Sequence, residues 1–157
     1  MIKKVYILHH SHTDVGYTDL QEQIIYNQVN NIRNVISFVR NGYEQDGPEK
    51  DFKWNCETYY CVEQFLKSAS PREQEGFFEL VRKGNIGISA TYLNFNDLAD
   101  ADMLDRRTAE MQELFTGRGL PVRAAMNADI NGISLGARDA LIKNFIELVF
   151  TYIYTHH

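Results

Sequence analysis

Apolar residues recur along this chain with two different spacings, and the spacing separates helices from strands. Between Leu20 and about Arg40 they fall at every third or fourth position, which is the period of a helix with one buried stripe. Asn41-Gly42 follows this run and predicts its end. Short apolar runs predict five strands, at about Val5–Leu8, Phe52–Cys56, Asn85–Ala90, Val122–Met126 and Leu148–Tyr154.

The segments between the later strands carry helix signals. Ser70-Pro71-Arg72-Glu73 combines an N-cap, a proline at the first position and the glutamate of a capping box, and Arg82-Lys83-Gly84 predicts the end of that helix. Further helices are predicted from 57 to about 67, from a cap at Asp100 or Asp102 to Gly117, and from about 135 to 144. Alternating strands and helices predict an α/β fold with a parallel sheet of right-handed βαβ units.

Polar side chains follow nearly every predicted strand. In folds built from parallel strands, ligands gather where the carboxyl ends of the strands meet. Polar tips are expected of any α/β protein, but His and Asp at so many of them indicate a site. The residues at these tips are His10, His12, Asp14, Glu57, Asn94, Asn96, Asp97, Asp129, His156 and His157.

The first of these tips suggests a metal site. Successive side chains of an extended chain point to opposite faces, so His10, His12 and Asp14 are expected to face the same way. Neutral imidazole and carboxylate oxygen both bind Zn²⁺ or a similar first-row ion. The alternative for Asp14 is a polar turn in which it caps a helix that starts at Tyr17.

Composition and net charge limit the classes of partner that this chain is expected to bind. The chain has 157 residues, 44% of them apolar and 24% charged, which suits one domain or part of a larger one. Its net charge of -5 argues against nucleic acid or an anionic membrane as the main partner. No stretch of it has the pattern expected of a signal peptide or of a membrane span, and Cys56 and Cys61 are interpreted as reduced thiols. A cytoplasmic location is therefore expected.

Two segments carry a family resemblance. His10-Ser11-His12-Thr13-Asp14-Val15-Gly16-Tyr17 resembles the His-x-His-x-Asp-x-Gly-Trp motif that opens the family 38 glycoside hydrolases, the class II α-mannosidases. Asp129-Ile130-Asn131-Gly132-Ile133-Ser134 is similar to the family's Asp-Pro-Phe-Gly-His-Ser segment, and Asn96-Asp97 is similar to an Asn-Asp pair between them. The order and spacing of these segments agree along nearly the whole chain.

The resemblance implies a zinc-dependent retaining α-mannosidase on a seven-stranded (β/α) barrel. It implies that His12, Asp14 and Asp129 hold Zn²⁺ and that Asp129 also attacks the anomeric carbon; Co²⁺ or Mn²⁺ would also suit this ligand set. Retaining hydrolysis needs such a carboxylate and a second one, about 5 Å away, as acid and then base. Residues expected to contact the sugar are His10, Tyr17, Glu57, Asn96, Asp97, His156 and His157.

The positions at which this chain differs from the family pattern lead to further predictions. Tyr17 replaces a Trp but keeps an aromatic platform, whereas Ile130, Asn131 and Ile133 replace Pro, Phe and His and indicate a different substrate. The family's fourth metal ligand and acid/base carboxylate lie further along than residue 157, and five strands are too few for its barrel. We therefore expect an incomplete barrel spanning residues 1–157, with weak or no activity unless a missing segment or self-association covers its open sheet edges.

Other interpretations remain open at this stage. Asp129 suits an Asx-turn that leads to Gly132, Glu57 and Asp97 suit helix caps, and His156 and His157 suit a frayed terminus. At the level of function, a metal-dependent carbohydrate deacetylase would use Asp129 as a ligand or base and never as a glycosyl carrier. A non-catalytic fragment that binds a carbohydrate or a metal is the third possibility.

Overall fold

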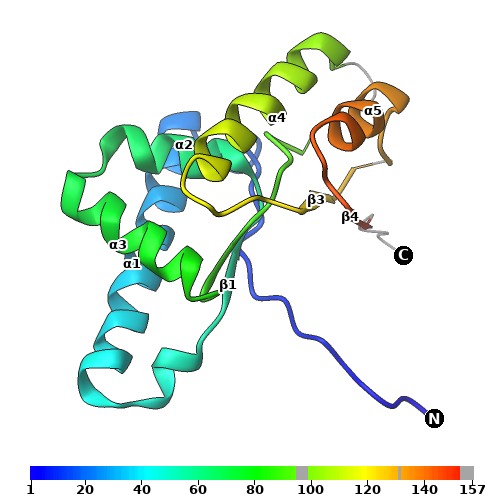
Figure 1. Cartoon of the computed structure of the whole chain (residues 1–157). Helices are drawn as coiled ribbons and strands as arrows, with labels where there is room; N and C mark the ends of the chain where they lie inside the picture. The colour runs from blue at the N-terminus through cyan, green and yellow to red at the C-terminus, as the bar shows by residue number, and fades with distance from the viewer. Residues whose placement is uncertain (95–98, 131, 153–157) are drawn as a thin grey trace.

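A computed structural model describes residues 1–94, 99–130 and 132–152 of the chain (Figure 1). It is a mixed α/β structure with short parallel strands. The elements in order are α1 (Gln21–Gln45), the 3-10 helix η1 (Pro48–Asp51), β1 (Trp54–Cys56), α2 (Tyr59–Ser68), α3 (Pro71–Arg82), β2 (Ile86–Ile88), α4 (Ala101–Thr116), β3 (Ala124–Ala128), α5 (Leu135–Lys143) and β4 (Leu148–Tyr152).

The strands lie side by side in the order in which they occur along the chain. β1 pairs with β2 and β3 pairs with β4, and both pairs are parallel. The two pairs adjoin, because the Ala90 amide donates to the Ala124 carbonyl over 2.9 Å. At the other side of β1, His10 forms a single parallel bridge with Asn55. The parallel α/β prediction is therefore confirmed, and the described residues form no closed barrel.

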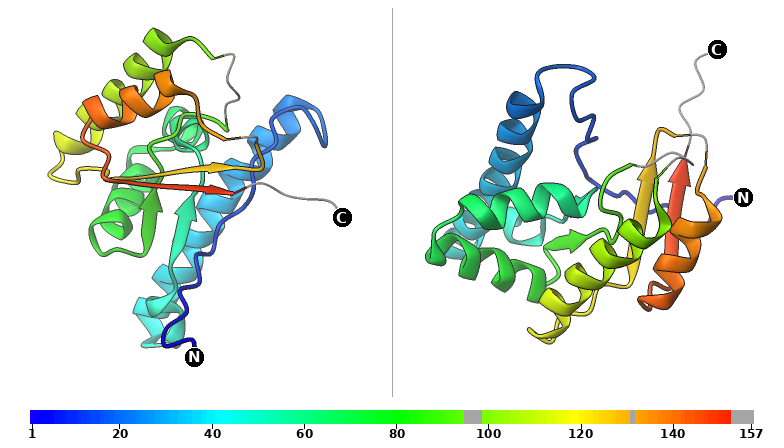
Figure 2. Two further views of the ribbon diagram at one scale, coloured as in Figure 1. Left: turned by 90° about the vertical axis from the view of Figure 1, so that its right-hand side faces the viewer. Right: turned by 90° about the horizontal axis from the view of Figure 1, so that it is seen from above.

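Helices pack against one another and against the strands to enclose one apolar core. α1 contacts α2 and α3, and α4 contacts α5, so the helices form two adjacent groups beside the strands (Figure 2). Five large side chains with no solvent exposure fill the centre of the core: Phe65, Phe77, Leu80, Met111 and Phe115. Within the described ranges, every helix is too short or too polar to serve as a membrane-spanning segment.

Several helix ends follow the sequence signals. The Ser70 side chain accepts from the Glu73 amide while the Glu73 carboxylate accepts from the Ser70 amide, so the predicted capping box begins α3. Asp100 caps α4 by accepting from the Met103 amide over 2.8 Å. These local predictions are confirmed because a cap needs only neighbouring backbone groups.

The predicted end of the first helix at Asn41-Gly42 is wrong. α1 continues to Gln45 and ends at Asp46, which adopts a left-handed conformation with φ of 53°. Gly42 is buried where η1 crosses the helix, and a Cβ there would lie 2.3 Å from the Lys50 amide nitrogen. The glycine therefore allows close packing instead of terminating the helix.

The predicted first strand, Val5–Leu8, does not form. Within the described residues, the segment makes ladder contact only at His10, and Val5 and Ile7 are 72% and 75% exposed. β1 spans only three residues, so it offers backbone partners to the end of this segment and not to its start. In Figure 1 the segment runs away from the helices toward the N-terminus.

Candidate functional site

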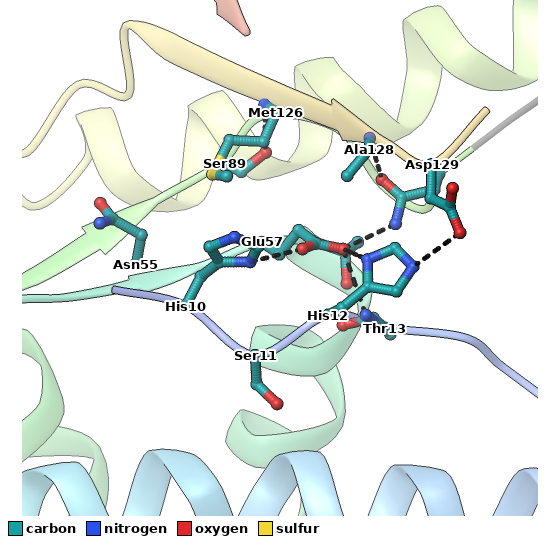
Figure 3. Close-up of polar contacts among 12 residues, drawn as sticks. His10, Ser11, His12, Thr13, Asn55, Glu57, Ser89, Met126, Ala128 and Asp129 are labelled. Carbon is teal, nitrogen blue, oxygen red and sulfur yellow. Dashed lines mark hydrogen bonds and ion pairs between the residues drawn. The ribbon is translucent and has the colours of Figure 1, made fainter. Parts of the chain in front are cut away.

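The buried carboxylate of Glu57, just after β1, is the centre of the candidate site (Figure 3). Its Oε1 accepts from the Asn94 Nδ2 group over 2.7 Å and from the Thr13 amide over 3.2 Å, and it lies 2.9 Å from His12 Nδ1. Its Oε2 lies 2.6 Å from His10 Nδ1. A buried charge needs several such donors, so Glu57 fixes all of the groups around it.

This arrangement sets which nitrogen of His12 faces the site. When Nδ1–H is donated to Glu57, the lone pair of the neutral ring lies on Nε2. That Nε2 atom is buried and makes no hydrogen bond of good geometry with any of the described residues. It lies 3.2 Å from Asp14 Oδ1, and it faces Asp129, whose Oδ2 is 3.8 Å away (Figure 3).

The two aspartates reach His12 from different segments. Asp14 belongs to the same extended segment as His12, two residues further along. Asp129 directly follows β3 and has a left-handed backbone with φ of 56°, which turns the chain at the end of the strand. Its amide donates to the Tyr152 carbonyl over 2.9 Å, and its side chain is 43% exposed. Asp129 is therefore held at the strand end and remains open to solvent.

The predicted alternation of the first segment is confirmed for His10 and His12. His10 and His12 both contact Glu57, whereas Ser11 points the opposite way, toward α1 (Figure 3). Asn31 of α1 donates to Ser11 Oγ over 3.2 Å, and Gln28 donates to the His12 carbonyl over 2.9 Å. α1 therefore holds the segment from one side while Glu57 holds it from the other.

Two of the alternative capping roles are excluded. α1 begins at Gln21, not near Tyr17, and its N-cap Leu20 has no side-chain cap bond, so Asp14 does not cap this helix. The N-cap of α2 is Thr58, and the Glu57 carboxylate contacts His10, His12, Thr13 and Asn94 instead.

Metal binding can be tested against the distances. No group of three or more His, Cys, Asp or Glu side chains within residues 1–94, 99–130 and 132–152 is placed to hold a metal ion. His12, Asp14 and Asp129 come nearest. Two ligands of one tetrahedral ion, each about 2.1 Å from it, would lie about 3.4 Å apart. The two observed distances from His12 Nε2, 3.2 Å to Asp14 and 3.8 Å to Asp129, lie on either side of this value, so each pair is close to the spacing of shared ligands although the described residues form no complete three-ligand site.

The other predicted residues fall into three groups. His10 contacts Glu57 at the centre of the site, and Glu57, a predicted sugar contact, is 2% exposed and held by the chain's own groups. Tyr17 lies on an exposed turn and is itself 89% exposed. The remaining four lie outside the described residues: Asn96, Asp97, His156 and His157.

The structure gives a place in the site to Asn94, which the sequence left without a role, and to Tyr152, which the sequence did not single out. Asn94 bonds to Glu57, and its place in the polar tip after the predicted third strand was the available signal. The Tyr152 ring packs edge-on near the His10 ring at a centroid distance of 6.4 Å. Burial raises the pKa of Tyr152, and the nearby carboxylates of Glu57 and Asp129 raise it further. No sequence signal marked Tyr152, because it reads as an ordinary strand residue.

No known protein-family model matches this chain, and no curated protein matches it. The geometry around Glu57 and His12 therefore carries the functional argument.

Proposed function

We propose that this chain is part of the catalytic domain of a metal-dependent retaining glycoside hydrolase that acts on α-mannosides or a related glycan. One observation carries the proposal: the buried Glu57 carboxylate holds His12 Nδ1, which directs the unsatisfied Nε2 toward Asp14 and Asp129. A carboxylate that orients a histidine in this way is the usual support of a histidine metal ligand. The order of the strands along the sheet supports its assignment to an incomplete (β/α) barrel.

The roles of the residues follow from their positions. His12 Nε2, Asp14 and Asp129 would hold the ion, which supplies a positive charge that binds sugar hydroxyls. Asp129, exposed at the end of β3, attacks the anomeric carbon through a carboxylate oxygen as the glycosidic C–O bond breaks. The leaving oxygen takes its proton from an acid that the resemblance places outside this sequence. His10, whose ring lies beside Glu57 and Tyr152, and the exposed Tyr17 are the proposed sugar contacts.

Metal content is the first test. The purified chain is measured by mass spectrometry for bound zinc, together with His12→Ala, Asp14→Ala and Asp129→Ala. We expect near-stoichiometric zinc in the native chain and its loss in all three variants. His9→Ala is the matched control, because His9 is the neighbouring histidine and its ring packs against Phe52 instead of facing Glu57. A folded native chain that binds no zinc, or variants that retain it, would contradict the proposed ligand set.

A trapping experiment separates the glycosidase from a carbohydrate deacetylase. A 2-deoxy-2-fluoro-mannosyl fluoride has a leaving group that departs without strong acid assistance, so it tests Asp129 even where the acid is missing. We expect a covalent mannosyl adduct on Asp129, mapped by peptide mass spectrometry, and none in Asp129→Asn. Release of acetate from an acetylated glycan, with no adduct on Asp129, would overturn the glycosidase and support the deacetylase.

A further inference from the structure

The side-chain amide of Asn94 joins two strand ends that have no backbone hydrogen bond in common. Its Nδ2 group donates to Glu57 Oε1, after β1, over 2.7 Å. Its Oδ1 accepts from the Ala128 amide, the last residue of β3, over 3.0 Å. One residue thus connects the carboxylate that orients His12 with the residue that directly precedes Asp129.

The backbone amides on the side of β3 that faces Asn94 show why the contacts of Asn94 matter. The Met126 amide donates to Ser89 Oγ over 2.9 Å, and the Ala128 amide donates to Asn94 Oδ1. Two successive amides on this side of β3 are therefore satisfied by side-chain oxygens instead of carbonyls of β2. Backbone bonds hold the end of β3 to β4 on its other side, whereas on this side the Asn94 side chain joins the end of β3 to Glu57 after β1.

Only a side chain with a donor and an acceptor can make both contacts. Glu57 Oε1 is a buried acceptor and the Ala128 amide is a donor, so an amide satisfies both ends at once. An Asp at position 94 would keep the acceptor for Ala128 but would place a second oxygen against Glu57. A Leu of similar size would leave the Ala128 amide without this acceptor and would remove one of the donors to Glu57 Oε1, which still contacts Thr13 and His12.

We propose that Asn94 is a positioning residue that sets the separation of His12 Nε2 and Asp129 Oδ2, now 3.8 Å, and through it the affinity of the site for a divalent cation. Asn94 acts on both sides of this gap: through Glu57 on the ring of His12, and through Ala128 on the turn that begins at Asp129. The consequence for cation affinity rests on the proposed function, whereas the positioning itself is a property of the metal-free chain.

The positioning is tested in the metal-free chain by NMR at one neutral pH. In Asn94→Leu we expect faster hydrogen exchange at the Ala128 amide and a change in the ¹⁵N shifts of the His12 ring, as Glu57 loses a donor. Asn94→Asp distinguishes the two contacts, because it keeps the acceptor for Ala128 and loses the donor to Glu57. In this variant the Ala128 amide should stay protected from exchange while the ¹⁵N shifts of the His12 ring change. Ser89→Ala is the matched control, because it should release the Met126 amide and leave Ala128 and His12 unchanged.

Zinc titration then measures the consequence. Replacing a group that supports a metal ligand typically weakens affinity by about 10- to 100-fold, so we expect that loss in Asn94→Leu and less than about twofold in Ser89→Ala. Unchanged Ala128 exchange and His12 shifts in both Asn94 variants would overturn the positioning role. If the native chain binds no zinc, the proposed function and the affinity consequence both fail, and the NMR result still decides whether Asn94 positions His12 and the turn before Asp129.

Discussion

At the scale of single residues, the molecule is unusual in how much depends on one buried carboxylate. Glu57 is 2% exposed, and its two oxygens contact His10, His12, Thr13 and Asn94. Hydrogen bonds to a buried charged group are stronger than neutral ones, and losing the charge leaves each donor less well satisfied. Glu57 therefore contributes to stability and to the direction of the His12 ring at once.

We expect Glu57→Gln to lower the free energy of unfolding by about 1–3 kcal/mol, because a neutral amide accepts these bonds more weakly and turns an NH₂ group toward one of the donors. Urea denaturation followed by circular dichroism measures the change. Glu75→Gln, at an exposed position of α3, is the control and should stay within about 0.5 kcal/mol of the native chain. Equal effects of the two substitutions would show that the contacts of Glu57 contribute nothing measurable.

The two cysteines give a second prediction at this scale. Burial raises the pKa of the Cys56 thiol and that of Cys61, so both are neutral in the folded chain. An unfolded thiol ionises near pH 8.5, so the folded state loses stability as the pH rises through that value and keeps it below. We expect both thiols to be unreactive toward a disulfide reagent at pH 8 until urea unfolds the chain. Rapid labelling of the folded chain would contradict this.

At the scale of elements, local signals predict the caps of α3 and α4 and the ends of both helices, whereas the end of α1 depends on packing. The capping box of α3 needs only residues within one turn, and it forms as the sequence indicates. The end of α1 depends on Gly42, whose missing side chain makes room for the Lys50 backbone from η1. The dipeptide Asn41-Gly42 carries the same local signal in either case, so only the tertiary contact decides its role.

The capping box of α3 predicts a pH dependence. Hydrogen bonds from the Ser70 amide and hydroxyl, and then from Arg33, lower the pKa of Glu73 to about 2. The stability that the Glu73 carboxylate contributes is therefore present above its ordinary pKa, near 4.5, and is lost as the pH falls toward 2. We expect the difference in unfolding free energy between native chain and Glu73→Gln to shrink over this range.

A second variant distinguishes the contribution of the Ser70 hydroxyl from that of the Glu73 charge. Ser70→Ala removes the N-cap hydroxyl and should cost about 1 kcal/mol at neutral pH. It also removes one of the bonds that lower the pKa of Glu73, so the acid transition of this variant should begin at higher pH than that of the native chain. An acid transition identical in all three proteins would show that the capping box does not control it.

At the scale of the whole molecule, the sheet formed by the described residues ends at β4, with no further strand paired beyond it. β4 pairs with β3 along one edge, and four of its apolar or aromatic side chains are at least 38% exposed: Leu148, Val149, Phe150 and Tyr152. At the other side of the sheet, the segment before His10 exposes Ile2, Val5, Tyr6 and Ile7. An unpaired edge with apolar side chains is a template for pairing with another chain. The predicted self-association stays a prediction that this surface supports.

We expect the chain to form larger species as its concentration rises, and Phe150→Lys to reduce them, because a charge on an open edge strand opposes pairing. Analytical ultracentrifugation over a range of concentrations measures both. Tyr26→Lys, at another exposed aromatic position on α1, is the control and should leave the association unchanged. A chain that stays monomeric at high concentration would contradict the prediction.

The sequence by itself determined the alternation of helices and parallel strands, the caps at Ser70 and Asp100, and the shared face of His10 and His12. Each of these depends on periodicity or on neighbours within a few residues, which the order of amino acids expresses directly. Only the tertiary structure decided that Glu57 is buried against both histidines, that Asn94 connects it to β3, and that Val5–Leu8 forms no strand. These outcomes depend on which segments meet in space and how long their partners are, and no local pattern contains that information.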